Sequence, residues 1–171
     1  LGYDIGPGNN LMDSYMKERF NKPFDLDGKV ASKGLVINKH VKSYLKNPFF
    51  KLKPPKSLDR LELFDSKILH ELKNEIPENT MSTLCDLTVK SILKGILFLP
   101  KIPKNCILVG GGQNNVYLVD QIKKLIPFKV STAKELELPG DHIESELIAF
   151  LAARKFFNLP STFPSTTGVN K

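Results

Sequence analysis

The chain has 171 residues and a mass of 19.2 kDa, and its 25 basic and 18 acidic residues give a net charge of +7. This length suits one domain with its own core, and a composition of 41% hydrophobic and 25% charged residues excludes an intrinsically disordered protein. No stretch approaches the roughly 18 apolar residues that a membrane-spanning helix needs, which excludes that class. Because the sequence opens at Leu1 in what reads as a strand, we expect a piece of a longer protein.

The positive charge comes almost entirely from lysine, because Arg19, Arg60 and Arg154 are the only arginines. Proteins that read nucleic-acid bases favour arginine, whose guanidinium group makes paired hydrogen bonds with base edges. The lysines are scattered and no aromatic platform lies between them, so the charge indicates a lysine-rich surface and no nucleic-acid partner. Cys85 and Cys106 are too few for a disulfide framework, which favours a reducing cytoplasm.

The first half of the chain reads as short helices joined by turns. In chain order the predicted elements are the end of a strand at 2–5, a helix from 11 to 20, a short helix capped by Asn38, an extended segment at 49–56 and a short helix near 68–72. Two turn-rich stretches interrupt them, Gly6-Pro7-Gly8-Asn9 and the polar segment 21–34.

The second half alternates helices and strands. It is predicted to hold a helix from Pro77 to about Leu97, a strand at 106–109, a helix at 116–125, a strand at 128–131 and a helix from His142 to Asn158 capped by Asp141. The continuous apolar run at 106–109 predicts a strand covered on both faces. A strand–helix–strand unit predicts two parallel strands with a right-handed crossover, so the class is α/β with a small sheet.

Two glycine-rich turns each follow a predicted strand and precede a predicted helix. They are Gly6-Pro7-Gly8-Asn9 and Gly110-Gly111-Gly112. Backbone N–H groups and a helix N-terminus can hold an anion in this arrangement. Asn115 stands where a dinucleotide fingerprint would have its third glycine, and the chain has no P-loop signature. One such turn is as often a plain turn as a binding site, and two of them favour a phosphate-bearing ligand.

Three carboxylates lie where they could face a ligand. Asp4 sits at a strand end beside the first glycine turn, where a general base contributes about 10²–10⁴ in rate. The alternative is an aspartate that accepts hydrogen bonds from the amides of its own turn. Asp13 and Glu144 lie in the first turns of predicted helices, where they could face the site or merely favour the helix dipole. The three histidines lack metal-ligand spacing, so no metal site is predicted.

Several short blocks carry a resemblance that runs through the whole chain. They are Gly2-Tyr3-Asp4-Ile5-Gly6-Pro7-Gly8-Asn9 with Leu11-Met12-Asp13, Phe24-Asp25-Leu26-Asp27-Gly28 with Ala31 and Gly34, Pro54-Pro55-Lys56-Ser57, Val109-Gly110-Gly111-Gly112 with Asn115, Ile143-Glu144, Leu159-Pro160, and Pro164-Ser165-Thr166-Thr167-Gly168. Together they resemble the anhydro-N-acetylmuramic acid kinase family. After Lys56-Ser57 the family usually has Thr-Gly-Arg, whereas this chain has Leu58-Asp59-Arg60.

The resemblance implies a fold and a reaction. The family has an actin-like, sugar-kinase (ribonuclease H-like) fold of two lobes, with a small sheet bearing helices on both faces and ATP in the cleft. It implies that residues 1–171 are the C-terminal lobe and that the N-terminal lobe is supplied in cis or in trans. The implied enzyme uses ATP and Mg²⁺ to open the 1,6-anhydro ring with water, phosphorylates O6 and yields N-acetylmuramate 6-phosphate for cell-wall recycling.

The resemblance also assigns roles to residues of this chain. It implies that Asp4 is the catalytic base, that Asp13 and Glu144 bind the amino sugar, and that the nucleotide is bound by Gly6, Gly8, Gly110, Gly111, Gly112 and Asn115. A homodimer is possible, and the chain alone is expected not to turn over substrate. Two alternatives stay open: a non-catalytic remnant or split lobe that keeps the fold and nucleotide binding, and a basic nucleic-acid-binding module.

Overall fold

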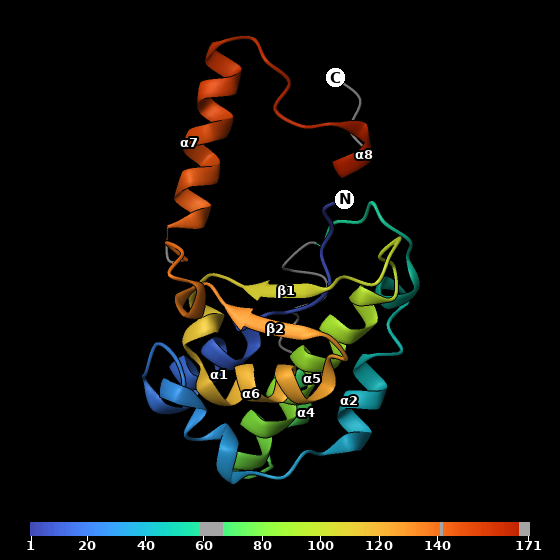
Figure 1. Cartoon of the computed structure of the whole chain (residues 1–171). Coiled ribbons are helices and arrows are strands. Elements are labelled where there is room, and N and C mark those ends of the chain that lie inside the picture. The colour runs from blue at the N-terminus through green and yellow to red at the C-terminus, as the bar shows by residue number, and fades with distance from the viewer. Residues whose placement is uncertain (59–66, 141, 168–171) are drawn as a thin grey trace.

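The computed structural model describes residues 1–58, 67–140 and 142–167 (Figure 1). The α-helices are α1 (Asn10–Phe20), α2 (Asn38–Tyr44), α4 (Lys67–Glu71), α5 (Pro77–Ile96), α6 (Val116–Leu125), α7 (Ile143–Phe156) and α8 (Pro164–Thr167). The strands are β1 (Asn105–Leu108) and β2 (Lys129–Thr132), and short 3₁₀ turns lie at Leu26–Gly28, Ala31–Lys33, Pro48–Lys51, Gly111–Asn114 and Lys134–Leu136. The described part is therefore mostly helical with a small parallel sheet.

Helix α5 is the centre of the core. Its side chains at Met81, Leu84 and Leu87 are fully buried, because α1, α2 and α6 pack around it (Figure 1). Burying each such side chain contributes about 1.5–3 kcal/mol, so this 20-residue helix anchors the fold. The sequence prediction of a long amphipathic helix here is confirmed. Neither α5 nor any other described helix has the length and apolarity to cross a membrane.

The two strands form the predicted parallel pair. Their register runs from Asn105 beside Lys129 to Leu108 beside Thr132, and α6 connects them. The prediction that β1 is covered on both faces is wrong. Cys106 and Leu108 pack against the core, whereas Ile107 is 46% exposed on the opposite face. Figure 1 shows the helical body on one side of the sheet, so the expected helices on both faces are not observed in the described residues.

The N-terminal segment is the second correction, because residues 2–5 do not form a strand. The Gly2 amide donates to the Thr166 carbonyl (2.7 Å), and the Asp4 amide donates to the Lys56 carbonyl (3.1 Å). Single bonds to two separate segments do not build a ladder, so the segment stays extended without being a strand.

Two predicted helix caps also change. Asn38 is the first residue of α2 and makes no side-chain cap, because Ile37 occupies the N-cap position. Asn47 instead caps the turn Pro48–Lys51, where its side chain accepts from the Phe49 amide (2.9 Å). The segment predicted as extended therefore begins as a 3₁₀ turn. The predicted cap Asp141 lies outside the described residues.

Helix α7 leaves the helical body and the chain then returns, so that α8 lies beside the N-terminus (Figure 1). The apolar side chains of Ile148, Phe150 and Phe156 are all exposed on α7. The Arg154 guanidinium lies over the rings of Phe150 (5.4 Å) and Phe163 (5.9 Å), which ties α7 to the returning segment. The predicted helix is present, but its apolar side chains lack a covering surface in the described part.

Candidate functional site

The two glycine turns meet in space. The Asn9 side chain packs on Gly112, where an added Cβ atom would lie 3.3 Å from Asn9 Oδ1. A cavity of about 250 Å³ lies at this junction. Its lining residues are Asn9, Asp13, Phe24, Asp25, Leu26, Asp27, Gly111, Asn114 and Asn115. Segments that are about a hundred residues apart in sequence thus form one pocket, lined by both polar and apolar side chains.

Gly111 lines this cavity, and Gly110 precedes it in the turn. Gly110 has φ +71°, a backbone conformation that favours glycine, and its amide donates to the Gly140 carbonyl (3.3 Å). Gly111 faces open space, since a Cβ atom there would meet no heavy atom within 4 Å. A ligand can therefore approach the Gly111 backbone directly.

Asn115 supports the turn from the other side. Its Oδ1 accepts from the Leu118 amide (3.0 Å) and so caps α6. Gly28, with φ +69°, packs so closely that an added Cβ atom would lie 2.6 Å from the same oxygen. The N-terminus of α6 consequently borders the cavity, and its partial positive charge favours an anionic ligand there.

Three aspartates line the cavity, and they differ in the hydrogen bonds and ion pairs that their carboxylates make. Asp25 is buried and accepts from the Val30 amide (3.0 Å) and the Ala31 amide (2.9 Å). Asp27 pairs with Lys29 at 3.4 Å. Asp13 has no such partner within the described residues, and burial raises the pKa of its carboxyl group. A desolvated carboxylate in a cavity is typical of a functional site, so Asp13 is the strongest ligand-facing candidate.

The same cavity could hold Mg²⁺ that enters bound to a nucleotide. Within residues 1–58, 67–140 and 142–167 no group of three or more histidine, cysteine or acidic side chains could hold a metal ion. Mg²⁺ that enters with a nucleotide is held mainly by phosphate oxygens and water, and it needs one or two carboxylates from the protein. The Asp13 carboxylate fits that requirement.

Asp4 lies apart from this cavity, on the extended N-terminal segment. Its Oδ2 atom accepts from the Leu58 amide (2.7 Å) and, at longer range, from the Ser57 hydroxyl (3.4 Å). The alternative in which Asp4 binds the amides of its own turn is therefore not observed. The carboxylate is exposed, and its partners lie 53 and 54 residues away in sequence.

Gly6 has a packing role in the structure, whereas Gly8 has a special backbone conformation and no close neighbour at its Cα hydrogen. An added Cβ atom at Gly6 would lie 2.5 Å from the Ser91 Cβ atom on α5. Gly8 has φ +56°, and its carbonyl accepts from the Thr88 hydroxyl (2.7 Å). Their role in nucleotide binding stays a prediction. Glu144 lies in the first turn of α7, and its side chain is outside the described part.

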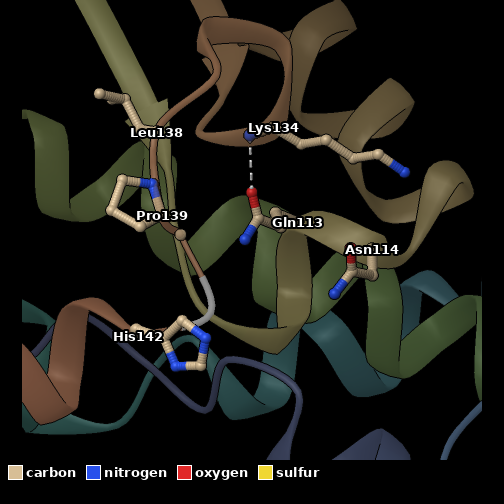
Figure 2. Close-up of a pocket in the computed structure, with 7 residues that line it drawn as sticks. Gln113, Asn114, Lys134, Leu138, Pro139 and His142 are labelled. Carbon is tan, nitrogen blue, oxygen red and sulfur yellow. Dashed lines mark hydrogen bonds between the residues drawn. The ribbon is translucent and has the colours of Figure 1, made fainter.

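A second cavity of about 290 Å³ lies beside Gln113 and Asn114 (Figure 2). Its lining includes Gln113, whose Oε1 accepts from the Lys134 amide (3.1 Å), and His142 at the start of α7. Figure 2 shows the Lys134 side chain extending away from Pro139. Asn114 lines both cavities, so the two lie close together.

Sequence reasoning missed several residues of the site. Asn9 and Asn114 enter it through tertiary contacts, and asparagine at a turn gives no separate signal because turns favour that residue. The hydrogen bond from the Leu58 amide to Asp4 cannot be predicted from the sequence, because nearly every residue carries an equivalent backbone donor.

Comparison with known proteins places the chain in a family. A family profile described as anhydro-N-acetylmuramic acid kinase matches residues 1–171. Proteins named anhydro-N-acetylmuramic acid kinase are similar to it: one from Rhodopseudomonas palustris (strain BisB18) is 40% identical over 99% of this chain and 46% of its own length. Another from Hydrogenovibrio crunogenus is 34% identical over 100% of this chain and 48% of its own length. The chain spans about half the length of these curated relatives, and it belongs to the anhydro-N-acetylmuramic acid kinase family.

Proposed function

We propose that residues 1–171 form the C-terminal lobe of an actin-like, two-lobe kinase that phosphorylates 1,6-anhydro-N-acetylmuramic acid in the cytoplasm. The observation that carries this proposal is the junction of the two glycine turns, where Asn9 packs on Gly112 beside an open Gly111. Family membership supports the choice of sugar and of ATP, because the relatives are named for that kinase activity.

The nucleotide occupies the cavity at that junction in this proposal. The Gly111 backbone lies open to it, and the N-terminus of α6 supplies partial positive charge for phosphate oxygens. The resemblance assigns Asp13 to the amino sugar, but Asp13 lines this cavity, so in this proposal its carboxylate would hold a cation that accompanies the nucleotide. Mg²⁺, when bound, neutralises charge on the transferring phosphoryl group.

Asp4 is the base in the proposed reaction. Water is a weak nucleophile at neutral pH, and a carboxylate oxygen that removes its proton allows it to attack the anomeric carbon. The bond from that carbon to the bridging oxygen breaks, and the oxygen remains on C6. That oxygen then takes the γ-phosphoryl group, which gives ADP and the 6-phosphate. Oδ2 of Asp4 accepts from the Leu58 amide, and in this proposal Oδ1 accepts the proton.

The rest of the proposed enzyme comes from a second lobe. Apolar side chains of α7 and the Ile107 face of the sheet are exposed, which supports a covering partner. The alternative is a remnant or split lobe that binds nucleotide without turnover. A homodimer and a separate N-terminal lobe are both compatible with this proposal.

A chimeric enzyme tests the function. Residues 1–171 would replace the matching part of the Rhodopseudomonas palustris (strain BisB18) relative, which is 40% identical. We expect the chimera to form ADP and sugar 6-phosphate in equal amounts from ATP and the anhydro-sugar, and the chain alone to form neither. A chimera that folds and binds ATP but makes no sugar phosphate would contradict the kinase proposal and favour the remnant. Turnover by the chain alone would contradict the need for a second lobe.

A further inference from the structure

Lys56 is a partly buried lysine with no acidic partner among the described residues. Its ammonium group donates to the Phe49 carbonyl (3.1 Å) and lies 4.3 Å from the centroid of the Phe49 ring. It also lies 4.7 Å from the centroid of the Phe98 ring, and burial lowers the pKa of the ammonium group. Two aromatic rings and a carbonyl oxygen thus take the place of a counter-ion.

Residues 56–58 contact Asp4 at three points. The Lys56 carbonyl accepts from the Asp4 amide (3.1 Å), and the Leu58 amide donates to Asp4 Oδ2 (2.7 Å). The Ser57 hydroxyl lies 3.4 Å from the same oxygen. Residues 56–58 therefore fix both the main chain and the side chain of Asp4.

The ammonium group itself makes no ion pair with Asp4 within 4 Å. The contacts that join Lys56 to Asp4 are made by the backbone. Phe98 follows α5, where its amide donates to the Gly95 carbonyl (3.0 Å), and Phe49 belongs to the turn Pro48–Lys51. The lysine consequently fastens residues 56–58 to two packed parts of the fold.

We propose that Lys56 is a positioning residue for Asp4, holding the Lys56–Leu58 backbone between Phe49 and Phe98 so that the carboxylate keeps one orientation. This inference rests on the proposed role of Asp4 as the base. A carboxylate on an exposed segment has many orientations, and small misplacements of a reacting group reduce rate strongly. The anchored backbone removes that freedom without placing a cation on the carboxylate.

The test compares Lys56→Met with Lys56→Arg in the chimeric enzyme. Methionine keeps an apolar stem and loses the charge and the donor, so we expect kcat to fall about tenfold to hundredfold with an unchanged KM for ATP. Arginine keeps the cation and should restore most of kcat. The matched control is Lys53→Met, an exposed lysine in the same segment, which should leave both constants unchanged. An unchanged kcat in Lys56→Met would overturn the proposal.

A second readout does not depend on catalysis. Hydrogen exchange of the Leu58 amide in residues 1–171 should accelerate at least tenfold in Lys56→Met, as it should in Asp4→Ala, which removes the acceptor, with no change in Lys53→Met. Unchanged Leu58 exchange would overturn the positioning role whatever the chimera does. Accelerated exchange with an inactive wild-type chimera would instead contradict the proposed function. Should Lys56→Met fail to fold, Phe98→Leu removes one ring while keeping an apolar side chain, and the same outcomes apply.

Discussion

Replacing Asp4 with asparagine is expected to lower sugar phosphorylation by about 10²–10⁴ in the chimeric enzyme. An amide cannot accept the proton of the attacking water. The asparagine Oδ1 atom can still accept from the Leu58 amide, so the local structure is retained. Because Asp4 does not line the nucleotide cavity, the affinity for ATP should stay unchanged.

The measurement combines product formation with ATP binding by calorimetry for each variant. Asp120→Asn is the matched control, because Asp120 is an exposed carboxylate on α6. It should leave both quantities unchanged. Full activity in Asp4→Asn would contradict the role of Asp4 as base, and an equal loss of ATP affinity would show that it acts in binding.

Among glycine-to-alanine substitutions at the described glycines, Gly34→Ala should cause the largest loss of stability. An added Cβ atom would lie 1.9 Å from the Glu78 carbonyl oxygen and 2.7 Å from the Asn79 amide nitrogen. These are backbone atoms in the first turn of α5, and they cannot move aside as a side-chain tip would. The Leu35 amide also donates to the Asn79 side chain (2.8 Å), which holds the two segments together. We expect the free energy of unfolding to fall by at least about 1–3 kcal/mol.

Urea denaturation followed by circular dichroism measures this loss. Gly111→Ala is the matched control, because an added Cβ atom there meets no heavy atom within 4 Å. The control should unfold at nearly the wild-type urea concentration. Equal midpoints for Gly34→Ala and wild type would contradict the close approach of Gly34 to α5.

The sequence predicted correctly those helices and strands whose formation depends on residues close together in the chain. Helix α5 and the β1–α6–β2 unit were predicted correctly because helical periodicity and strand–helix–strand order are written in consecutive residues. The strand at 2–5 and the cover on both faces of β1 were wrong. Whether a segment pairs as a strand, or has both faces covered, depends on which distant segment packs against it. A short apolar run does not contain that information.

The features of the candidate site also differ in how far the sequence could predict them. Gly110 and Asn115 were predicted as nucleotide-binding residues, and that role stays a prediction. The structure gives Gly110 a left-handed backbone and makes Asn115 the cap of α6. The contact of Asn9 with Gly112 and the binding of Asp4 by Leu58 could not be predicted, because each joins segments far apart in sequence. Gly6 was singled out as a nucleotide-binding residue and that role stays a prediction, whereas its close approach to Ser91 depends on a distant segment and could not be predicted.

Calorimetric titration of residues 1–171 with ATP and Mg²⁺, beside the variant Gly111→Leu, tests the central claim that the junction of the glycine turns is the nucleotide site. Leucine would fill the open space at Gly111 without disturbing the core. We predict saturable binding to one site in the wild type, and at least a tenfold loss of affinity in Gly111→Leu at an unchanged free energy of unfolding. Equal affinity in the two proteins, or no binding by the folded wild-type chain, would contradict that claim.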